Sequence, residues 1–219
     1  MRGNQKNLGP LMAEEKEQMA DCQKWVDKAA TRSMTVQFLL SSLKSLGCPT
    51  PEFKSFVNCV KCPAPMSGAF MMDSQTKKPE IAICANYCKA AGGYDFVEET
   101  LVHELIHSVD ICRAKLPKDG ENQLSSCRQI ACMEIRASNM SGECRWGKEF
   151  MRGNGLSIQG QQKECVKRRA GLSMLVHEKC VKQGVKGGEG KGKGCEKYID
   201  EVFGACYRDT YPFERHPDS

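Results

Sequence analysis

Two histidines four residues apart, with a glutamate after the first, are the residues of this sequence most able to do chemistry. They occur in the stretch His103-Glu104-Leu105-Ile106-His107, in a chain of 219 residues that contains only 4 histidines. Positions i and i+4 of a helix lie on one face, so both imidazoles can bind the same metal ion. This spacing is typical of Zn²⁺ sites. The stretch therefore predicts a zinc site on a helix.

Glu104 gives the predicted site a catalytic function. A carboxylate beside the first histidine can take a proton from a water molecule that the metal activates. Zinc lowers the pKa of such a water from about 15.7 towards 7, which makes it a nucleophile at neutral pH. We expect this water to attack a peptide carbonyl, and Glu104 to pass the proton to the leaving amine as general acid/base. The prediction is a zinc metalloendopeptidase with one catalytic ion; the alternative is an ordinary buried helix with two satisfied histidines.

A catalytic zinc ion needs a third protein ligand and an open position. The sequence after His107, "SVDICRAKL", lacks the further histidine of the longer HExxHxxGxxH motif. Glu134, in "ACMEIRAS" on the next predicted helix, is one candidate. Asp110 is the other, as a ligand or as a group that orients a histidine. We favour Glu134, because three ligands from one straight helix crowd the metal. We expect Arg136 to be a structural ion-pair partner.

The remaining histidines and two tyrosines are weaker candidates. His177 and His216 lie in no motif, and we expect them to be ordinary surface or core residues. Tyr207 and Tyr211 are able to donate to an oxyanion. No spacing supports either tyrosine, so both are left outside the predicted site.

Helices must hold these side chains, and the spacing of apolar residues predicts several. Ala13–Leu46 is expected to be helical, since apolar side chains recur there at intervals of three and four residues. Asp95 can cap the helix that carries the histidines, with Glu98 in the capping-box position. The further helices are predicted to run from Asp95 to about Arg113, and over about Gln129–Met140, Gln161–Val176 and Glu196–Tyr207.

Two short apolar runs predict a hairpin. Ala69–Met72 and Ile81–Cys84 flank a polar loop at residues 73–80. We therefore expect an α+β fold that is mostly helical, with a small antiparallel sheet. We expect Ile81–Cys84 to be an edge strand beside the cleft, where a peptide substrate could add as a further strand.

The chain is predicted to have an N-terminal helical segment, residues 1–50, and a main domain, residues 51–219. Gly47 and Pro49 end the first helical region. In the main domain, the glycine-rich stretch "GVKGGEGKGKGC" predicts a flexible surface loop at about residues 184–194.

The cysteines indicate an oxidising compartment. There are 14, and a reduced cytosolic protein rarely carries so many. The even number fits a disulfide framework whose connectivity stays open. The CxxC pair Cys59 and Cys62, followed by Cys84 and Cys88, is an alternative zinc knuckle, but we favour disulfides. A redox pair would need an exposed thiol with a lowered pKa.

Other features narrow the compartment and the partners. The first residues lack the apolar core of a signal peptide and make a poor mitochondrial presequence. No stretch approaches the roughly 18 apolar residues that span a bilayer. A disulfide-rich chain of this kind fits the mitochondrial intermembrane space. The net charge of +5 is mild and aromatics are 7% of residues, so no nucleic-acid partner is expected.

The chain resembles the mitochondrial inner-membrane-associated zinc metalloproteases that process and help assemble the F-type ATP synthase. The matching stretches run in order from about Val57 to Phe213. They are "SGAF", "IAICAN", "VHELIHSVDICRA", "ACMEIRASNMSGEC", "ECVKRRAGLS" and "IDEVFGACYRDTYPFE". This set is far more specific than the five-residue metal motif alone.

The resemblance implies a disulfide-rich, zincin-like metallopeptidase bound peripherally to the intermembrane-space face of the inner membrane. It implies that His103 and His107 bind zinc and that Glu104 is the acid/base. The implied substrate and client is the membrane-embedded subunit a of the ATP synthase, whose assembly the protein also assists. Oxidation on import by the intermembrane-space disulfide relay is implied too. The alternative is a non-proteolytic assembly chaperone with a structural zinc, and Glu104 favours the enzyme because a structural site needs no such carboxylate.

Overall fold

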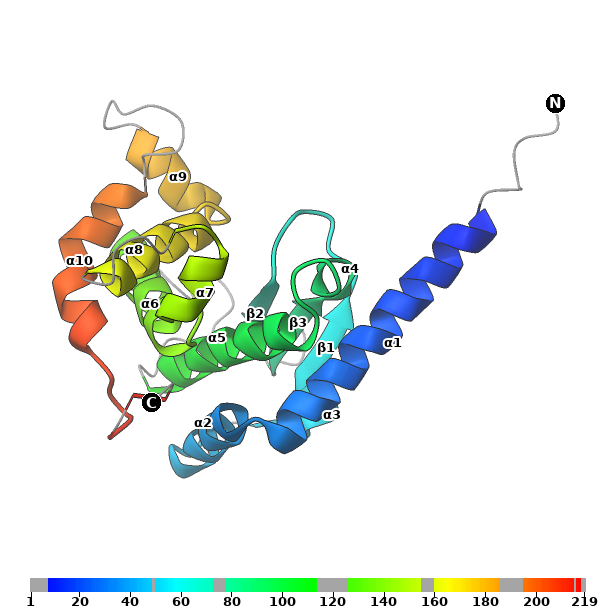
Figure 1. Ribbon diagram of the computed structural model, residues 1–219. Helices are drawn as coiled ribbons and strands as arrows, with labels where there is room; N and C mark the ends of the chain where they lie inside the picture. Colours follow the sequence, from blue (N-terminus) through cyan, green and yellow to red (C-terminus); the bar gives the residue numbers. More distant parts are fainter. Residues whose placement is uncertain are drawn as a thin grey trace. The chain divides into compact units, whose positions relative to one another are not determined.

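The computed structural model describes residues 8–48, 50–72, 78–113, 126–154, 160–185, 195–214 and 216–217. In these ranges the chain is mostly helical, with a small sheet (Figure 1). The helices are α1 (Leu8–Arg32), α2 (Met34–Ser45), α3 (Phe53–Phe56), α4 (Ala85–Cys88), α5 (Tyr94–Arg113), α6 (Cys127–Met140), α7 (Trp146–Met151), α8 (Gln161–Met174), α9 (Glu178–Val185) and α10 (Glu196–Arg208). The strands are β1 (Val57–Val60), β2 (Gly68–Met72) and β3 (Pro79–Cys84).

The residues group into two compact units, Met1–Leu105 and Ile106–Ser219, and the division falls within helix α5. The predicted boundary near residue 50 stays a prediction. Most of the predicted polar loop at 73–80, and all but the first residues of the predicted glycine-rich loop, lie outside the described residues.

The long predicted helices are confirmed, with small differences at their ends. Residues 13–46 form α1 and α2, which are separated by Ser33, whose hydroxyl accepts the Val36 N–H and so caps α2. Helix α5 ends at Arg113 as predicted but starts at Tyr94, so Asp95 lies in its first turn and is not the N-cap. Helices α7 and α9 were not predicted, because each is too short to show a clear period.

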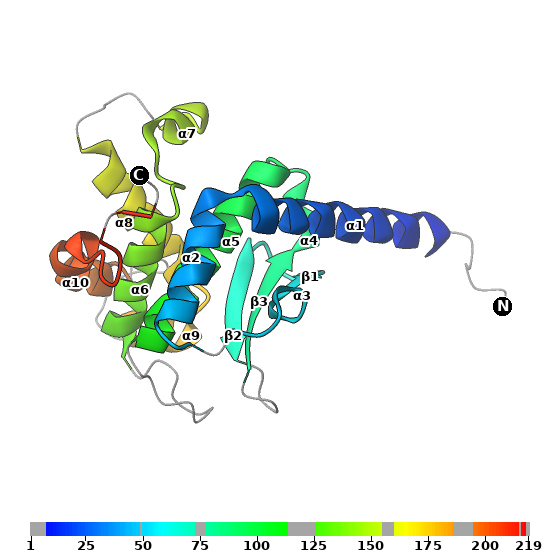
Figure 2. The same ribbon diagram turned by 90° about the horizontal axis from the view of Figure 1, so that it is seen from below.

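The sheet is mixed, so the expectation of a purely antiparallel sheet is wrong. Strands β2 and β3 form the predicted antiparallel pair, with Phe70 opposite Ile81. Strand β1 pairs with the other side of β3 in parallel, with Val57 also opposite Ile81. Strand β3 is therefore central and not the expected edge strand, in the order β1-β3-β2 (Figure 2). Strand β1 was not predicted because it is only four residues long and no hairpin turn joins it to its partner strand.

Gly68 lets the first half of α5 lie close to the sheet in the first unit. A Cβ atom at Gly68 would lie 2.6 Å from the Ala82 carbonyl oxygen and 2.8 Å from the Thr100 side chain on α5. Gly93 has a φ of +64° immediately before α5 begins, a conformation that favours glycine. These two glycines fix where α5 starts and how closely it approaches β2.

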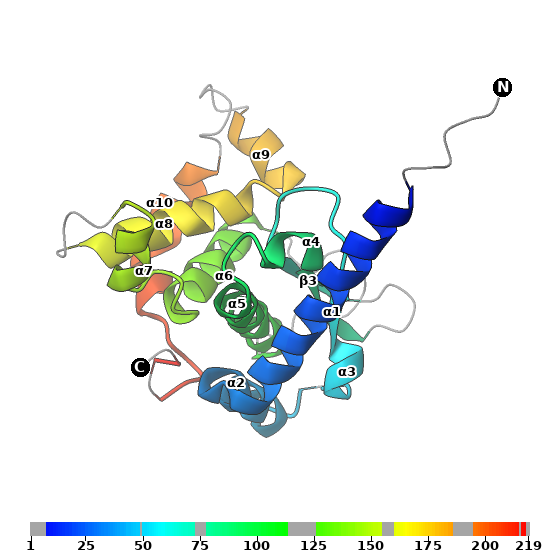
Figure 3. The same ribbon diagram turned by 45° about the vertical axis from the view of Figure 1, so that its right-hand side comes forward.

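The core of the second unit is formed by α6, α8 and α10, which contact one another (Figure 1, Figure 3). Helix α6 is buried along nearly its whole length, including Ile130 and Ile135. The core also includes Val166 on α8 and Ile199 on α10. A helix that is buried on most sides is a rigid support for a side chain that must stay in one place.

Each of the two units contains disulfides, as the cysteine count predicts. In the first unit they join Cys22 to Cys59 and Cys62 to Cys84. In the second unit they join Cys127 to Cys180, Cys132 to Cys206 and Cys144 to Cys165. Helix α6 is thereby linked covalently to α9 and to α10.

The preference for disulfides over a zinc knuckle is confirmed. Cys59 and Cys62 are bonded to different partners, so they are neither a metal site nor a redox pair. Cys88 is a buried free thiol, and burial raises its pKa to about 11. A thiol with this pKa is almost fully protonated at neutral pH and a poor ligand or nucleophile.

Glu149 on α7 gives the second unit a pH-dependent contribution to stability. Its side chain is 1% exposed and pairs with Arg168 and Arg152. Burial acts to raise the pKa of Glu149, but the hydrogen bonds and charges of these arginines outweigh it and lower the pKa below the ordinary 4.5. A carboxyl with a lowered folded-state pKa stabilises the fold above its unfolded pKa, and this contribution is lost as the pH falls through the folded value.

We expect Glu149→Gln to lower the free energy of unfolding by roughly 1–3 kcal/mol at pH 7. This is less than the cost of breaking a fully buried ion pair, because both arginines are partly exposed to solvent. The deficit relative to the native chain is expected to shrink below about pH 4, where the native carboxyl is protonated too. Denaturant titrations at several pH values measure this. Glu178→Gln, which breaks an exposed pair with Lys182, is the control. A deficit that is equal at pH 7 and pH 3 would contradict the expectation.

Candidate metal centre

Helix α5 carries the two histidines of the metal motif one turn apart, as predicted. The residues around them are apolar and buried, including Leu105 and Ile106. His107 is buried, with 7% of its surface exposed, and His103 is half-buried. The apolar stripe of α5 packs into the core and leaves the imidazoles on a neighbouring face of the same helix.

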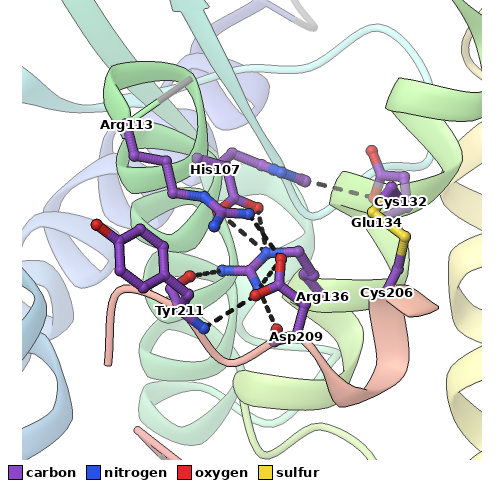
Figure 4. Close-up of polar contacts among 9 residues, drawn as sticks. His107, Arg113, Cys132, Glu134, Arg136, Cys206, Asp209 and Tyr211 are labelled. Atoms are coloured by element: carbon purple, nitrogen blue, oxygen red, sulfur yellow. Dashed lines mark hydrogen bonds and ion pairs between the residues drawn. A yellow bond between two sulfur atoms is a disulfide. The ribbon is translucent and has the colours of Figure 1, made fainter. Parts of the chain in front are cut away.

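Glu134 is brought to these histidines by helix α6. Its Oε2 atom lies 3.5 Å from Nε2 of His107 (Figure 4). Ligand atoms of His103, His107 and Glu134 all lie within 4.8 Å of one another. In a tetrahedral zinc site with bonds of about 2.0–2.1 Å, ligand atoms are about 3.3 Å apart. The cluster therefore fits a metal ion held by two imidazoles and one carboxylate.

Glu104 is on the same helix and is 6% exposed. It follows His103 directly, so its side chain leaves α5 about 100° further round the axis. A buried carboxylate beside two metal-binding imidazoles is suited to accept a proton at the centre. Its catalytic role stays a prediction.

Asp110, the rival third ligand, faces arginines. Arg136 donates from Nε to both carboxylate oxygens, at 3.1 and 2.9 Å, and Arg113 donates to Oδ1 at 3.0 Å. Asp110 is also outside the metal cluster found among the described residues. The arrangement favours Glu134 over Asp110 as the third ligand. It also confirms Arg136 as a structural ion-pair partner.

Arg136 holds the part of α6 that carries Glu134. It is 1% exposed and, besides Asp110, it contacts the segment after α10 (Figure 4). Its guanidinium pairs with the Asp209 carboxylate at 2.9 Å and donates to the carbonyl oxygens of Asp209 and Tyr211. Burial acts to raise the pKa of Asp209, but the hydrogen bond from Arg113 and the charge of Arg136 outweigh it and lower that pKa. Asp209 is therefore ionised at neutral pH.

Glu134 is thus bracketed on α6 by two fixed neighbours. Two residues before it, Cys132 is bonded to Cys206 on α10. Two residues after it, Arg136 is held by carboxylates and carbonyls. Because both neighbours are anchored, Glu134 has little freedom to move along or around the helix axis.

His177 lies next to the candidate metal cluster, a position that the sequence did not indicate. Its Nε2 atom lies 3.8 Å from Oε1 of Glu134. No motif surrounds it, and 43 residues separate it from Glu134 in the sequence. The two tyrosines that were left outside the site have other described contacts: the backbone oxygen of Tyr207 accepts from Asn139, and that of Tyr211 accepts from Arg136.

Comparison with known proteins identifies a peptidase family. The sequence profile of the peptidase M76 family matches residues 20–214. The chain belongs to this family. All four predicted site residues lie inside the matched range of this M76 member, and they include the metal cluster.

Several named relatives match most of the chain. The mitochondrial inner membrane protease atp23 of Emericella nidulans is 35% identical over 200 residues, which span 89% of this chain and 73% of the relative. The protein of the same name from Aspergillus niger is 34% identical over 200 residues, or 90% and 74% of the two chains. A homologue from Danio rerio is 33% identical over 198 residues, or 90% and 68%.

No solved structure matches this M76 chain, so the zincin-like part of the fold prediction stays a prediction. The mostly helical architecture with a small sheet is the part that the described residues confirm. None of the helices described here is both long and apolar enough to cross a membrane.

Proposed function

We propose that this M76 peptidase is a zinc-dependent endopeptidase of the mitochondrial intermembrane space that processes subunit a of the ATP synthase and assists assembly of that enzyme. The observation that carries the proposal is the convergence of His103, His107 and Glu134, with Glu104 beside them, in a peptidase family. The relatives named as mitochondrial inner membrane proteases support the location. The disulfides support an oxidising compartment.

The site residues have two proposed roles: three of them bind the metal, and Glu104 transfers a proton. His103, His107 and Glu134 would hold the ion through two neutral nitrogens and one anionic oxygen. When bound, zinc supplies Lewis acidity that polarises a peptide carbonyl and lowers the pKa of water. Glu104 takes the proton of the attacking water and delivers it to the amine nitrogen as the peptide bond breaks. Asp110 and Arg136 keep α5 and α6 in register, so the ligands from the two helices meet.

The proposed partners and surroundings rest on the family resemblance given in the sequence analysis. The chain would act while bound peripherally to the inner membrane, where the membrane-embedded subunit a is its substrate and client. It would acquire its disulfides from the intermembrane-space relay during import. Relatives named as mitochondrial inner membrane proteases support the placement at the inner membrane.

Metal removal tests the proposed function. We expect the purified, oxidised chain to contain about one zinc ion, and a chelator to abolish cleavage of a subunit a precursor. Added Zn²⁺ should restore cleavage, whereas Mg²⁺ should not, because Mg²⁺ prefers oxygen ligands. Metal content by mass spectrometry and product formation on a gel measure the two quantities. Full cleavage by a metal-free chain with an unchanged circular dichroism spectrum would reject the proposal.

A further inference from the structure

The two carboxylate oxygens of Glu134 face two different histidines. Oε2 lies 3.5 Å from Nε2 of His107, and Oε1 lies 3.8 Å from Nε2 of His177. All three residues belong to the second unit of the chain. The Glu134 side chain is 9% exposed and that of His177 is 33% exposed. His177 therefore lies on the solvent side of a nearly buried carboxylate.

The chain holds His177 in this place by contacts on both sides of it. Its N–H donates to the Met174 carbonyl oxygen at the end of α8, at 3.1 Å. Its own carbonyl oxygen accepts the N–H groups of Cys180 and Val181 in the first turn of α9, at 2.8 and 3.1 Å. Cys180 is in turn bonded to Cys127 on α6, the helix that carries Glu134. The position of the His177 backbone relative to α6 is thus restrained by a covalent link within the same unit.

A carboxylate that binds a metal through one oxygen is oriented by a donor to its other oxygen. Without such a donor, the carboxylate is able to turn and bind through both oxygens, which fills the open position that catalysis needs. A neutral imidazole can supply the donor, because one ring nitrogen carries a hydrogen. The separation of 3.8 Å between Nε2 of His177 and Oε1 of Glu134 is longer than a hydrogen bond of about 2.7–3.2 Å. A movement of the ring by about 1 Å would therefore form the hydrogen bond. Such contacts commonly tighten when a site is filled.

We propose that His177 is a positioning residue that donates its Nε2–H to Oε1 of Glu134 when the metal binds. Glu134 then binds the metal through Oε2 alone, on the side of His107, and the open position is kept. The inference rests on the proposed zinc centre and adds to it a residue outside the metal motif. His177 acts through Glu134 and is not itself a metal ligand.

Zinc affinity tests this assignment without measuring catalysis. We expect His177→Ala to weaken Zn²⁺ binding about 10- to 100-fold, as is usual when a partner of a metal ligand is removed. His177→Gln should stay within a few-fold of the native chain, because its amide nitrogen can donate from nearly the place of Nε2. Competition with a chromophoric chelator measures both. Glu178→Ala, which changes the exposed next residue, is the matched control and should bind like the native chain.

Cobalt substitution gives a spectroscopic test of the same assignment. The visible absorption of Co²⁺ weakens when its coordination number rises from four to five. We expect His177→Ala to absorb more weakly than the native chain and His177→Gln to resemble it. Native affinity and a native spectrum in His177→Ala would overturn the proposal. So would an affinity loss in His177→Gln equal to that in His177→Ala, in a variant with the native melting temperature.

Three outcomes separate this inference from the proposed function. X-ray absorption that finds three imidazoles on the zinc of the native chain would make His177 a ligand and reject the positioning role alone. A native chain that binds no zinc would reject both the proposed function and this inference. Native zinc binding with no effect of His177→Ala would leave the proposed function standing and reject only the role of His177.

Discussion

Glu104→Gln is expected to reduce the rate of cleavage of a subunit a precursor by about 10²–10⁴-fold, the usual contribution of a general acid/base. Glutamine has nearly the shape of glutamate, but its amide cannot accept the proton of the attacking water. Zinc content should stay at about one ion per chain, because Glu104 is outside the cluster of His103, His107 and Glu134. Initial rates of product formation and metal analysis of the same preparation measure the two effects.

Glu98→Gln is the matched control, since it makes the same substitution on the same helix, nearer its start. It should cleave at the native rate. A Glu104→Gln variant that also cleaves at the native rate would remove Glu104 from the mechanism. If neither the native chain nor the variant cleaves, while both bind zinc and ATP synthase assembly still depends on the protein, the alternative of a chaperone with a structural zinc is correct.

Arg136→Met is expected to lower the free energy of unfolding by about 3–5 kcal/mol, the usual result of removing one partner of a buried ion pair. Arg136 is 1% exposed and Asp110 is 3% exposed, so the substitution leaves a carboxylate in the interior without its main counter-charge. It also removes donors to the backbone of Asp209 and Tyr211. Denaturant titration of the oxidised chain, followed by circular dichroism, measures the change.

Arg128→Met is the control for this prediction. Arg128 also lies on α6 and pairs with Glu201, but both side chains are largely exposed, so the cost should be about 0–1 kcal/mol. The double substitution Arg136→Met with Asp110→Leu should recover part of the loss, because no buried charge is then left alone. Equal losses in Arg136→Met and Arg128→Met would show that the buried network does not stabilise α6.

Most of the features predicted correctly from the sequence are local ones, and the proximity of Glu134, which lies on the next long helix, is the exception. The helix around His103 and His107 follows from a period of 3.6 residues, and the spacing within one turn places both imidazoles on one face. The proximity of Glu134 was predicted from the ligand number that zinc requires. The contact that disfavours Asp110 is not local, since the arginine that donates to both of its oxygens is 26 residues away.

The features that were missed depend on contacts between distant residues. Strand β1 is parallel to β3 and has no turn joining them that a sequence pattern could reveal. The partner of Cys62 is Cys84 and that of Cys59 is Cys22, a choice that the spacing of the cysteines leaves open. His177 reaches Glu134 only because α8, α9 and a disulfide return that part of the chain to α6.

The anchoring of α6 has a consequence for the metal-free protein. In many small zinc proteins the metal orders the chain that binds it, so the binding free energy is largely folding free energy. Here, bonds from Cys127 and Cys132, together with the contacts of Arg136, oppose any local opening of the helix that carries Glu134. The amide hydrogens of α6 should therefore exchange with solvent about as slowly without zinc as with it. An arriving ion should therefore meet Glu134 already in place, and ordering α6 should cost little conformational entropy when it binds.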